Sequence, residues 1–290
     1  MDIVKLMKKV KKIQIKTNRL VDELFGGEYH SAFKGKGLEF ADLRKYEPGD
    51  DFRSIDWKIT AKFNTPYVKM YEEERELTIL FLLDMSDSMN FCSKYETKLY
   101  TAAEIAAIIS LSAVKNKDKI GAVFFDENIR KSIKPAKGLK HSLVIIRDML
   151  AMNSVNGKTD YSKVLDYVLN VHKKKAVVFF ISDFINFNQW KQLSILNKKH
   201  DLICVKIKDR LEENPPEFLY SELQEFETSN IKTVSTGDNR EIKSKIIKAE
   251  EEFSKNILKS GVDLVSIYTG EDYVRELNLF FKKRISRRNR

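Results

Sequence analysis

Residues 77–89 read Leu-Thr-Ile-Leu-Phe-Leu-Leu-Asp-Met-Ser-Asp-Ser-Met, an apolar run that stops at Asp84, Ser86 and Ser88. The apolar half has the composition of a buried strand. Asp and Ser at alternate positions after it offer oxygen ligands, which suit Mg²⁺ or Mn²⁺ better than a soft metal. In open α/β sheets, ligands lie just outside the carboxyl ends of the strands, where this triplet would stand.

Two later segments strengthen this interpretation, because the triplet alone would also suit an ordinary turn. A polar loop over residues 156–160 contains Thr159 and precedes a helix predicted over 161–171. A second apolar run, residues 176–183, ends on Asp183. Neighbouring parallel strands would bring Asp183 beside Asp84 at one edge of one sheet. The candidate metal ligands are therefore Asp84, Ser86, Ser88, Thr159 and Asp183.

This set resembles the metal-ion-dependent adhesion site of von Willebrand factor A domains. The pattern of that family is Asp-x-Ser-x-Ser, then a loop Thr, then an Asp after a later strand, and every position is filled here. The resemblance implies that the two Ser and the Thr approach the metal most directly, and that the two Asp often act through water. It also implies one open coordination position for a carboxylate of a partner, and adhesion without turnover.

Strand and helix patterns alternate from residue 77 onward, which predicts an α/β fold with a mainly parallel sheet covered on both faces. Together with the metal pattern, this suggests a von Willebrand factor A-like, Rossmann-like sheet of six strands. Only a hairpin fits the short link between the strands predicted over 119–125 and 129–133, so one edge strand should be antiparallel. The expected strands begin near residues 77, 119, 129, 176, 202 and 262, and the expected helices span 95–114, 140–151, 161–171, 189–197, 241–258 and 271–281.

We expect two parts in the chain: an N-terminal extension over 1–75 and the α/β domain over 76–290. Apolar residues recur every three or four positions over 3–25, with lysines between them, which predicts a helix. Packing of its apolar stripe on the body is favoured over a membrane-surface helix. An insert at about 209–238 should carry a small β-hairpin, and the basic residues 282–290 should fray.

The segment before the first buried strand indicates a more specific family. It has no P-loop pattern, but its Arg and Asp residues suggest a paired network around a buried Trp57. Its ordered positions are Glu39-Phe40-x-Asp42-x-Arg44-x-Tyr46-x-Pro48-Gly49-Asp50-Asp51-x-Arg53-x-Ile55-Asp56-Trp57, followed by Ala61-Lys62. Together with the metal pattern, these positions resemble the DUF58 family. The resemblance implies an association with MoxR-type AAA+ ATPases and a role in assembling or maturing other proteins.

The composition of the chain limits the cellular compartments and partners to be expected. The chain of 290 residues contains two cysteines, which give no disulfide framework and favour a reduced, cytoplasmic compartment. No signal-peptide core is present, and no apolar run approaches the ~18–20 residues that a membrane span needs. A net charge of +10 permits an anionic membrane surface or nucleic acid as a partner. We therefore expect a cytoplasmic protein, with peripheral membrane contact left open.

The function favoured by these observations is a non-enzymatic, metal-dependent adaptor that grips an Asp or Glu of a protein partner. A metal-dependent phosphohydrolase is the first alternative, although Ser86 stands where phosphoaspartyl transfer usually needs a second Asp. The four histidines fit no metal-ligand spacing. Nucleic-acid or anionic-surface binding is the other alternative, and neither a zinc finger nor an aromatic-rich basic strand supports a nucleic-acid partner.

Overall fold

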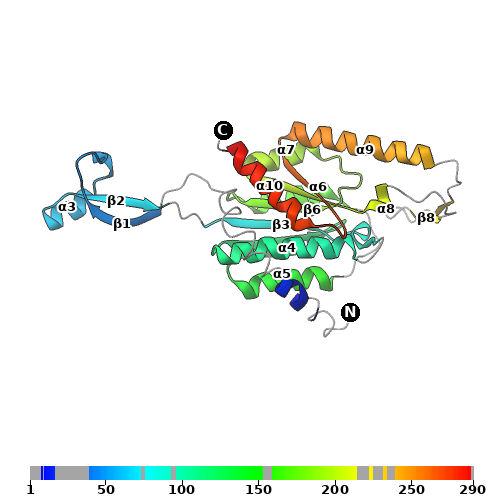
Figure 1. Cartoon of the computed structure of the whole chain (residues 1–290), viewed down its shortest axis with the longest axis horizontal. Coiled ribbons are helices and arrows are strands. Elements are labelled where there is room, and N and C mark those ends of the chain that lie inside the picture. The colour runs from blue at the N-terminus through cyan, green and yellow to red at the C-terminus, as the bar shows by residue number, and fades with distance from the viewer. Residues whose placement is uncertain are drawn as a thin grey trace. The chain divides into compact units, whose positions relative to one another are not determined.

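A six-stranded sheet forms the centre of the computed structural model, and the strand that ends at Asp84 lies in its interior (Figure 1). Five neighbouring strands run parallel, and the sixth pairs antiparallel at one edge. The predicted six-stranded, mainly parallel α/β sheet is therefore confirmed, as is its antiparallel edge. In spatial order the strands are β10 (Asp263–Tyr268), β7 (Asp201–Lys208), β6 (Val177–Ser182), β3 (Thr78–Asp84), β4 (Lys119–Phe125) and β5 (Ile129–Ala136).

The structure describes residues 8, 10–16, 39–72, 76–92, 96–152, 159–213, 222–224, 231–233 and 239–288. These divide into a smaller unit within Phe33–Glu76 and a larger unit that contains the six-stranded sheet. The smaller unit pairs β1 (Glu39–Lys45) with β2 (Tyr67–Glu72) in an antiparallel hairpin. Between these strands lie the 3-10 helix η2 (Phe52–Ser54) and the helix α3 (Trp57–Phe63).

Helices cover both faces of the large sheet, because its central strands are apolar on both sides. On one face, α4 (Lys98–Lys115) packs on α5 (Leu139–Ala151). On the other face, α6 (Tyr161–Val171), α7 (Trp190–Lys199) and α9 (Asn239–Ser260) bury their apolar sides against Leu80, Leu82 and Phe180. The remaining elements are η3 (Asp87–Asn90), α8 (Arg210–Glu213), the short antiparallel strands β8 (Glu222–Gln224) and β9 (Ile231–Thr233), and α10 (Tyr273–Arg288).

The N-terminal residues 10–16 are helical, as the periodicity predicts, and the rest of the predicted helix over 3–25 lies largely outside the described residues. Val10 and Ile13 are buried, and Lys16 pairs with Glu104 of α4 at 2.9 Å. The apolar stripe therefore packs on the body, as expected. None of the described helices combines the length and apolar character needed to cross a bilayer.

Two expectations from the sequence are wrong. Trp57 is not buried but 68% exposed. Arg44 and Asp50, nearby in the chain, do form a bidentate pair. The basic C-terminal segment does not fray before residue 288, because α10 continues through it. Arg284 is buried there and pairs with Asp201 and Asp263, which begin two neighbouring strands.

Candidate functional site

Asp84 is the last residue of β3 and is fully buried at the carboxyl edge of the sheet. The pairing of Leu83 with Ile181 continues toward Ser182, whose hydroxyl donates to Asp84 Oδ2 at 2.6 Å. The other oxygen, Oδ1, accepts the backbone N–H of Ser86 at 2.9 Å. The side chain is thus held in one orientation by groups from its own turn and from the neighbouring strand.

Ser86 and Ser88 leave the strand through a tight turn that brings their side chains together. The backbone of Ser86 is extended and begins the 3-10 helix η3, which ends the strand pattern. Both residues are buried, and their hydroxyl oxygens lie 3.1 Å apart. The alternation of Asp and Ser seen in the sequence therefore places Asp84 and the two hydroxyls in one hydrogen-bonded cluster.

Asp183 follows β6, the strand beside β3, and is 4% exposed. The next residue, Phe184, has a φ of +55°, a left-handed conformation that is uncommon for a bulky side chain. Its ring is held in the core by Phe180, with ring centres 5.0 Å apart, and by Phe253 at 5.5 Å. Core packing of Phe184 thus fixes the turn that leaves Asp183 at the sheet edge.

A buried lysine joins the site from α4. Lys98 is 0% exposed, and its ammonium group donates to Asp183 Oδ2 at 2.7 Å and to Glu212 Oε1 of α8 at 2.6 Å. Burial alone would lower the pKa of Lys98, but the two carboxylates outweigh it and raise the pKa. Lys98 is therefore a fixed positive charge that connects Asp183 with α8.

The pKa of Asp84 is raised to about 7, first because the carboxylate is buried and second because Asp183 carries like charge nearby. The hydrogen bonds from Ser182 and Ser86 act in the opposite direction but do not cancel the effect. An isolated Asp84 carboxylate is therefore costly near neutral pH, and an added positive charge beside it would favour the ionised form.

Thr159 lies two residues before Tyr161, at the start of α6, and is partly buried. The Tyr161 hydroxyl reaches Asp84 Oδ2 at 3.5 Å and the Ser182 hydroxyl at 3.1 Å, so the N-terminus of α6 lies beside the cluster. Residues 156–158 of the predicted loop lie outside the described residues. The structure thus joins Asp84, Ser86 and Ser88 directly and places Asp183 close to Asp84, while the metal-ligand role of all five residues stays a prediction.

The donor set fits a hard divalent cation. Carboxylate and hydroxyl oxygens are the ligands that Mg²⁺ and Mn²⁺ prefer, and no soft ligand belongs to the cluster. Among the described residues no group of three or more His, Cys, Asp or Glu is arranged to hold a metal ion. A site here would therefore depend on the serine and threonine hydroxyls as well as the two aspartates.

Four neighbours of the site were not predicted from the sequence: Lys98, Tyr161, Ser182 and Glu212. Each comes from a different element, and only the folded sheet brings them within 3.5 Å of one another or of a predicted ligand. One signal was available, since Lys98 opens a helix in which most of the following residues are apolar or small. A lone charge on such a helix is rarely buried without a partner.

The fold and site define an α/β protein with a polar, oxygen-rich cluster at the carboxyl edge of two central parallel strands. The family model named "Protein of unknown function DUF58" matches residues 42–256, and the chain belongs to this family. The uncharacterized proteins Rv1480 of Mycobacterium tuberculosis and Mb1516 of Mycobacterium bovis are each 23% identical over 98% of this chain and 91% of their own length. The resemblance to DUF58 is thus confirmed.

Two solved structures resemble this chain distantly. Proximal thread matrix protein 1 from the mussel byssus matches with 14% identity and a TM-score of 0.38, over 72% of this chain and 70% of that chain. An uncharacterized membrane spanning protein from Vibrio fischeri matches with 14% identity and a TM-score of 0.23, over 72% and 97% of the two chains. Both scores are too low to identify a common fold.

Proposed function

We propose that this protein is a metal-dependent adaptor of the von Willebrand factor A type, whose adhesion site is formed by Asp84, Ser86, Ser88, Thr159 and Asp183. The observation that carries the proposal is the pair of buried carboxylates at the ends of β3 and β6, beside two clustered hydroxyls. When bound, Mg²⁺ or Mn²⁺ would supply a positively charged centre that attracts a carboxylate of a protein partner. We propose binding without turnover, as the resemblance to the adhesion site implies.

The local charge supports a divalent cation. When ionised, the buried Asp84 and Asp183 and the partly exposed Glu212 contribute three negative charges, and Lys98 contributes one positive charge, which leaves two negative charges. Such an excess is expensive away from water. One divalent cation would neutralise it, whereas a purely structural ion-pair cluster would be expected to balance its own charge.

Calorimetric titration of the full chain with MgCl₂ and MnCl₂ tests the site. The wild-type protein is expected to bind one divalent ion, and Asp84→Ala is expected to bind at least ten-fold more weakly because it loses a buried carboxylate. Asp118→Asn is the matched control, since Asp118 is also fully buried but lies before β4, at the opposite edge of the sheet. Equal metal binding by the wild-type protein and Asp84→Ala would refute the site.

The partner is proposed to present an Asp or Glu to the metal, and a MoxR-type AAA+ ATPase is the candidate that family resemblance suggests. A metal–carboxylate contact acts at short range, so it should be less sensitive to salt than a contact between charged surfaces. Asp84→Ala and Thr159→Ala should abolish such a contact without unfolding the protein. Replacement of the partner's contacting carboxylate by an amide should likewise abolish the contact.

A pull-down of the purified candidate ATPase with the full chain tests this partnership. Capture is expected in Mg²⁺, and EDTA should reduce it at least ten-fold because the bridging ion is removed. Asp118→Asn should capture the ATPase as well as the wild-type protein does. Capture that is undiminished by EDTA would show that any contact with the ATPase does not pass through a metal.

A further inference from the structure

Lysines gather at the amino edge of the large sheet, which is the edge where the parallel strands begin. A lysine in an exposed position precedes β4, three precede β6, one precedes β10, and one lies in the last turns of α10. The C-terminal part of α10 reaches this edge because Arg284 pairs with the first residues of β7 and β10. We call these six residues the amino-edge patch: Lys117, Lys173, Lys174, Lys175, Lys259 and Lys283.

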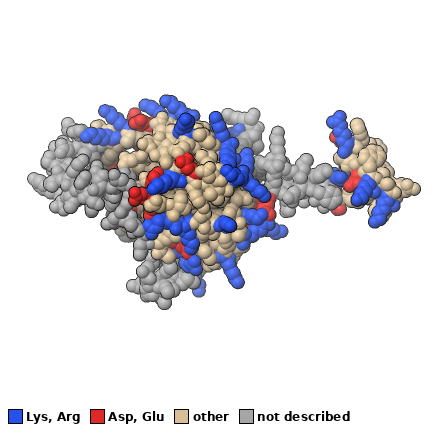
Figure 2. Space-filling view, turned by 180° about the vertical axis from the view of Figure 1, so that it is seen from behind, with Lys and Arg blue, Asp and Glu red and all other residues tan. Residues whose placement is uncertain are grey.

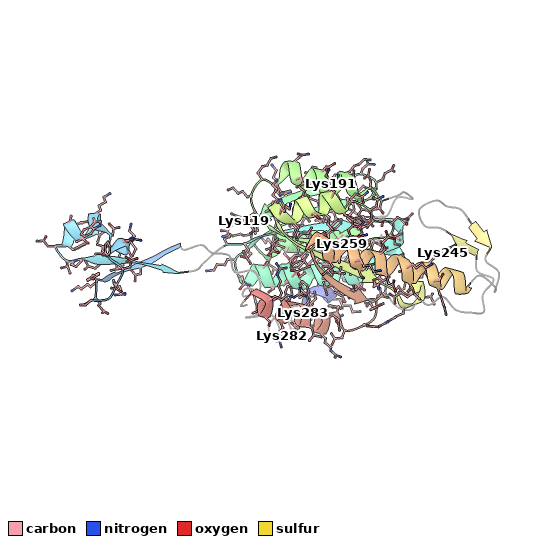
Figure 3. The ribbon with its side chains drawn as sticks, turned by 90° about the horizontal axis from the view of Figure 1, so that it is seen from above. Lys119, Lys191, Lys245, Lys259, Lys282 and Lys283 are labelled. Carbon is pink, nitrogen blue, oxygen red and sulfur yellow. The ribbon has the colours of Figure 1, made fainter. Side chains whose placement is uncertain are left out.

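The patch carries a positive field because nearby carboxylates are already engaged. Asp118 is fully buried and accepts the N–H of Leu77, and Asp201 and Asp263 pair with Arg284. Figure 2 shows Lys and Arg side chains over much of this face of the larger unit, where they outnumber Asp and Glu. In Figure 3, the labels of Lys119, Lys282 and Lys283 stand toward one end of this unit and that of Lys245 toward the other, with those of Lys259 and Lys191 between them.

The helix dipole explains part of this pattern, since helices end at the amino edge and favour cations in their last turns. It does not explain the exposed aliphatic side chains that accompany the lysines. Leu258 is 80% exposed and directly precedes Lys259, and Val171 is 52% exposed and ends α6 just before Lys173. Burial of these two side chains at an interface would remove apolar area from water and add to the attraction of the lysines.

We propose that the amino-edge patch docks on an anionic phospholipid surface, with its lysines among the headgroups and Leu258 and Val171 entering the interface. Interspersed lysines and aliphatic side chains are the combination that binds such surfaces, through electrostatic attraction together with burial of apolar area. Nucleic-acid contacts would instead favour arginine forks and aromatic platforms. The six residues of the patch are lysines, and the exposed apolar side chains beside it, Leu258 and Val171, are aliphatic. Arg287 also lies at this edge, where it pairs with Asp263.

This orientation would leave the candidate metal site free. The amino and carboxyl edges are separated by the length of the strands, and β3 has seven residues. At about 3.3 Å per residue this is roughly 20 Å. The lipid surface and a partner at Asp84 could therefore be bound together, although the lipid contact does not depend on the metal site.

Co-sedimentation of the full chain with vesicles tests the proposal. Wild-type protein is expected to bind phosphatidylcholine vesicles that contain phosphatidylglycerol, and not phosphatidylcholine alone. Lys173→Gln, Lys174→Gln and Lys175→Gln in one variant should weaken this binding roughly 100-fold, because each lysine near an anionic surface contributes about a factor of five. Leu258→Ser should weaken it several-fold while leaving the dependence on salt nearly unchanged.

The matched control removes the same charge elsewhere. Lys191→Gln, Lys245→Gln and Lys248→Gln replace three exposed lysines in the first turns of α7 and α9, away from the amino edge. This variant is expected to sediment with the anionic vesicles as the wild-type protein does. The proposal would be overturned if both triple variants lost vesicle binding equally. It would also be overturned if the variant at Lys173, Lys174 and Lys175 bound the vesicles as well as the wild-type protein does. The assignment to lipid would be wrong if the wild-type protein bound duplex DNA as tightly as the anionic vesicles and Leu258→Ser left the DNA binding unchanged.

Discussion

In metal-free buffer at about pH 8, Asp84→Asn should unfold at a higher temperature than the wild-type protein, and excess Mg²⁺ should reverse this order. The pKa of Asp84 is raised from 3.8 to about 7, because burial and the nearby Asp183 oppose its ionisation. The native protein therefore binds this proton more tightly than the unfolded chain does. Stability that is present at low pH is lost as the pH rises from about 4 to about 7.

The size of this loss in stability follows from the difference between the pKa of Asp84 in the folded protein and its ordinary value. Each unit of pKa shift corresponds to about 1.4 kcal/mol, so three units give an upper bound near 4 kcal/mol, and about 2–4 kcal/mol is expected. Asn keeps the acceptor for the Ser86 N–H and removes the charge. In the wild-type protein, Mg²⁺ at about 100 times its dissociation constant should add about 2.7 kcal/mol, which Asp84→Asn would not gain.

Thermal unfolding monitored by circular dichroism, from about pH 5 to pH 8 with EDTA or Mg²⁺, measures both effects. Asp118→Asn is again the control: it should keep the stabilisation by Mg²⁺, because its site lies at the amino edge. If Asp84→Asn is the less stable protein in EDTA at every pH, and Mg²⁺ stabilises neither, then Asp84 serves only as a structural hydrogen-bond acceptor.

Lys98→Met is expected to lower stability in EDTA and to increase affinity for Mg²⁺. Lys98 is fully buried between Asp183 and Glu212, so its removal leaves two carboxylates without their cation. Breaking a buried pair in this way costs about 3–5 kcal/mol at neutral pH. The same loss makes the region more negative by one charge, which should raise Mg²⁺ affinity at least ten-fold.

Chemical denaturation and calorimetry of the same preparation separate the two effects. Glu212→Gln is the useful comparison, because it leaves the contact between Lys98 and Asp183 in place and should weaken stability less. A purely structural lysine would give a destabilised protein whose Mg²⁺ affinity is unchanged or reduced. That result would show that the charge of Lys98 does not influence the affinity of the site for metal.

The sequence predicted single elements well wherever local chemistry decides them. The strand Lys119–Phe125 and the helix Tyr161–Val171 have the bounds expected from their apolar patterns. Asp160 begins that helix by accepting N–H groups from Ser162 and Lys163, which is the local bonding that makes Asp a frequent first cap. The turn after Asp84 is partly local, since Asp84 accepts the Ser86 N–H, while Met85 donates its N–H to Phe125 of the neighbouring strand β4.

Predictions failed where a local tendency competed with distant partners. The Arg and Asp residues around Trp57 predict that it is buried within their network, yet it is exposed in its unit. Basic C-terminal residues were expected to fray, but Phe281 and Arg284 lie one helical turn apart and both are buried. Two carboxylates from β7 and β10 meet Arg284, and no pattern within residues 282–290 contains them.

The sequence by itself determined the order of the strands and main helices of the larger unit and the alternation of Asp84, Ser86 and Ser88, because periodicity and turn chemistry act between neighbours. It did not predict the β1–β2 hairpin or α3 of the smaller unit. Tertiary structure decided which strand lies beside β3, and so placed Ser182 and Asp183 next to Asp84. It also enclosed Lys98 between Asp183 and Glu212, which lie 85 and 114 positions away in the chain. Burial and charge depend on such distant neighbours, so the raised pKa of Asp84 exists only in the folded sheet.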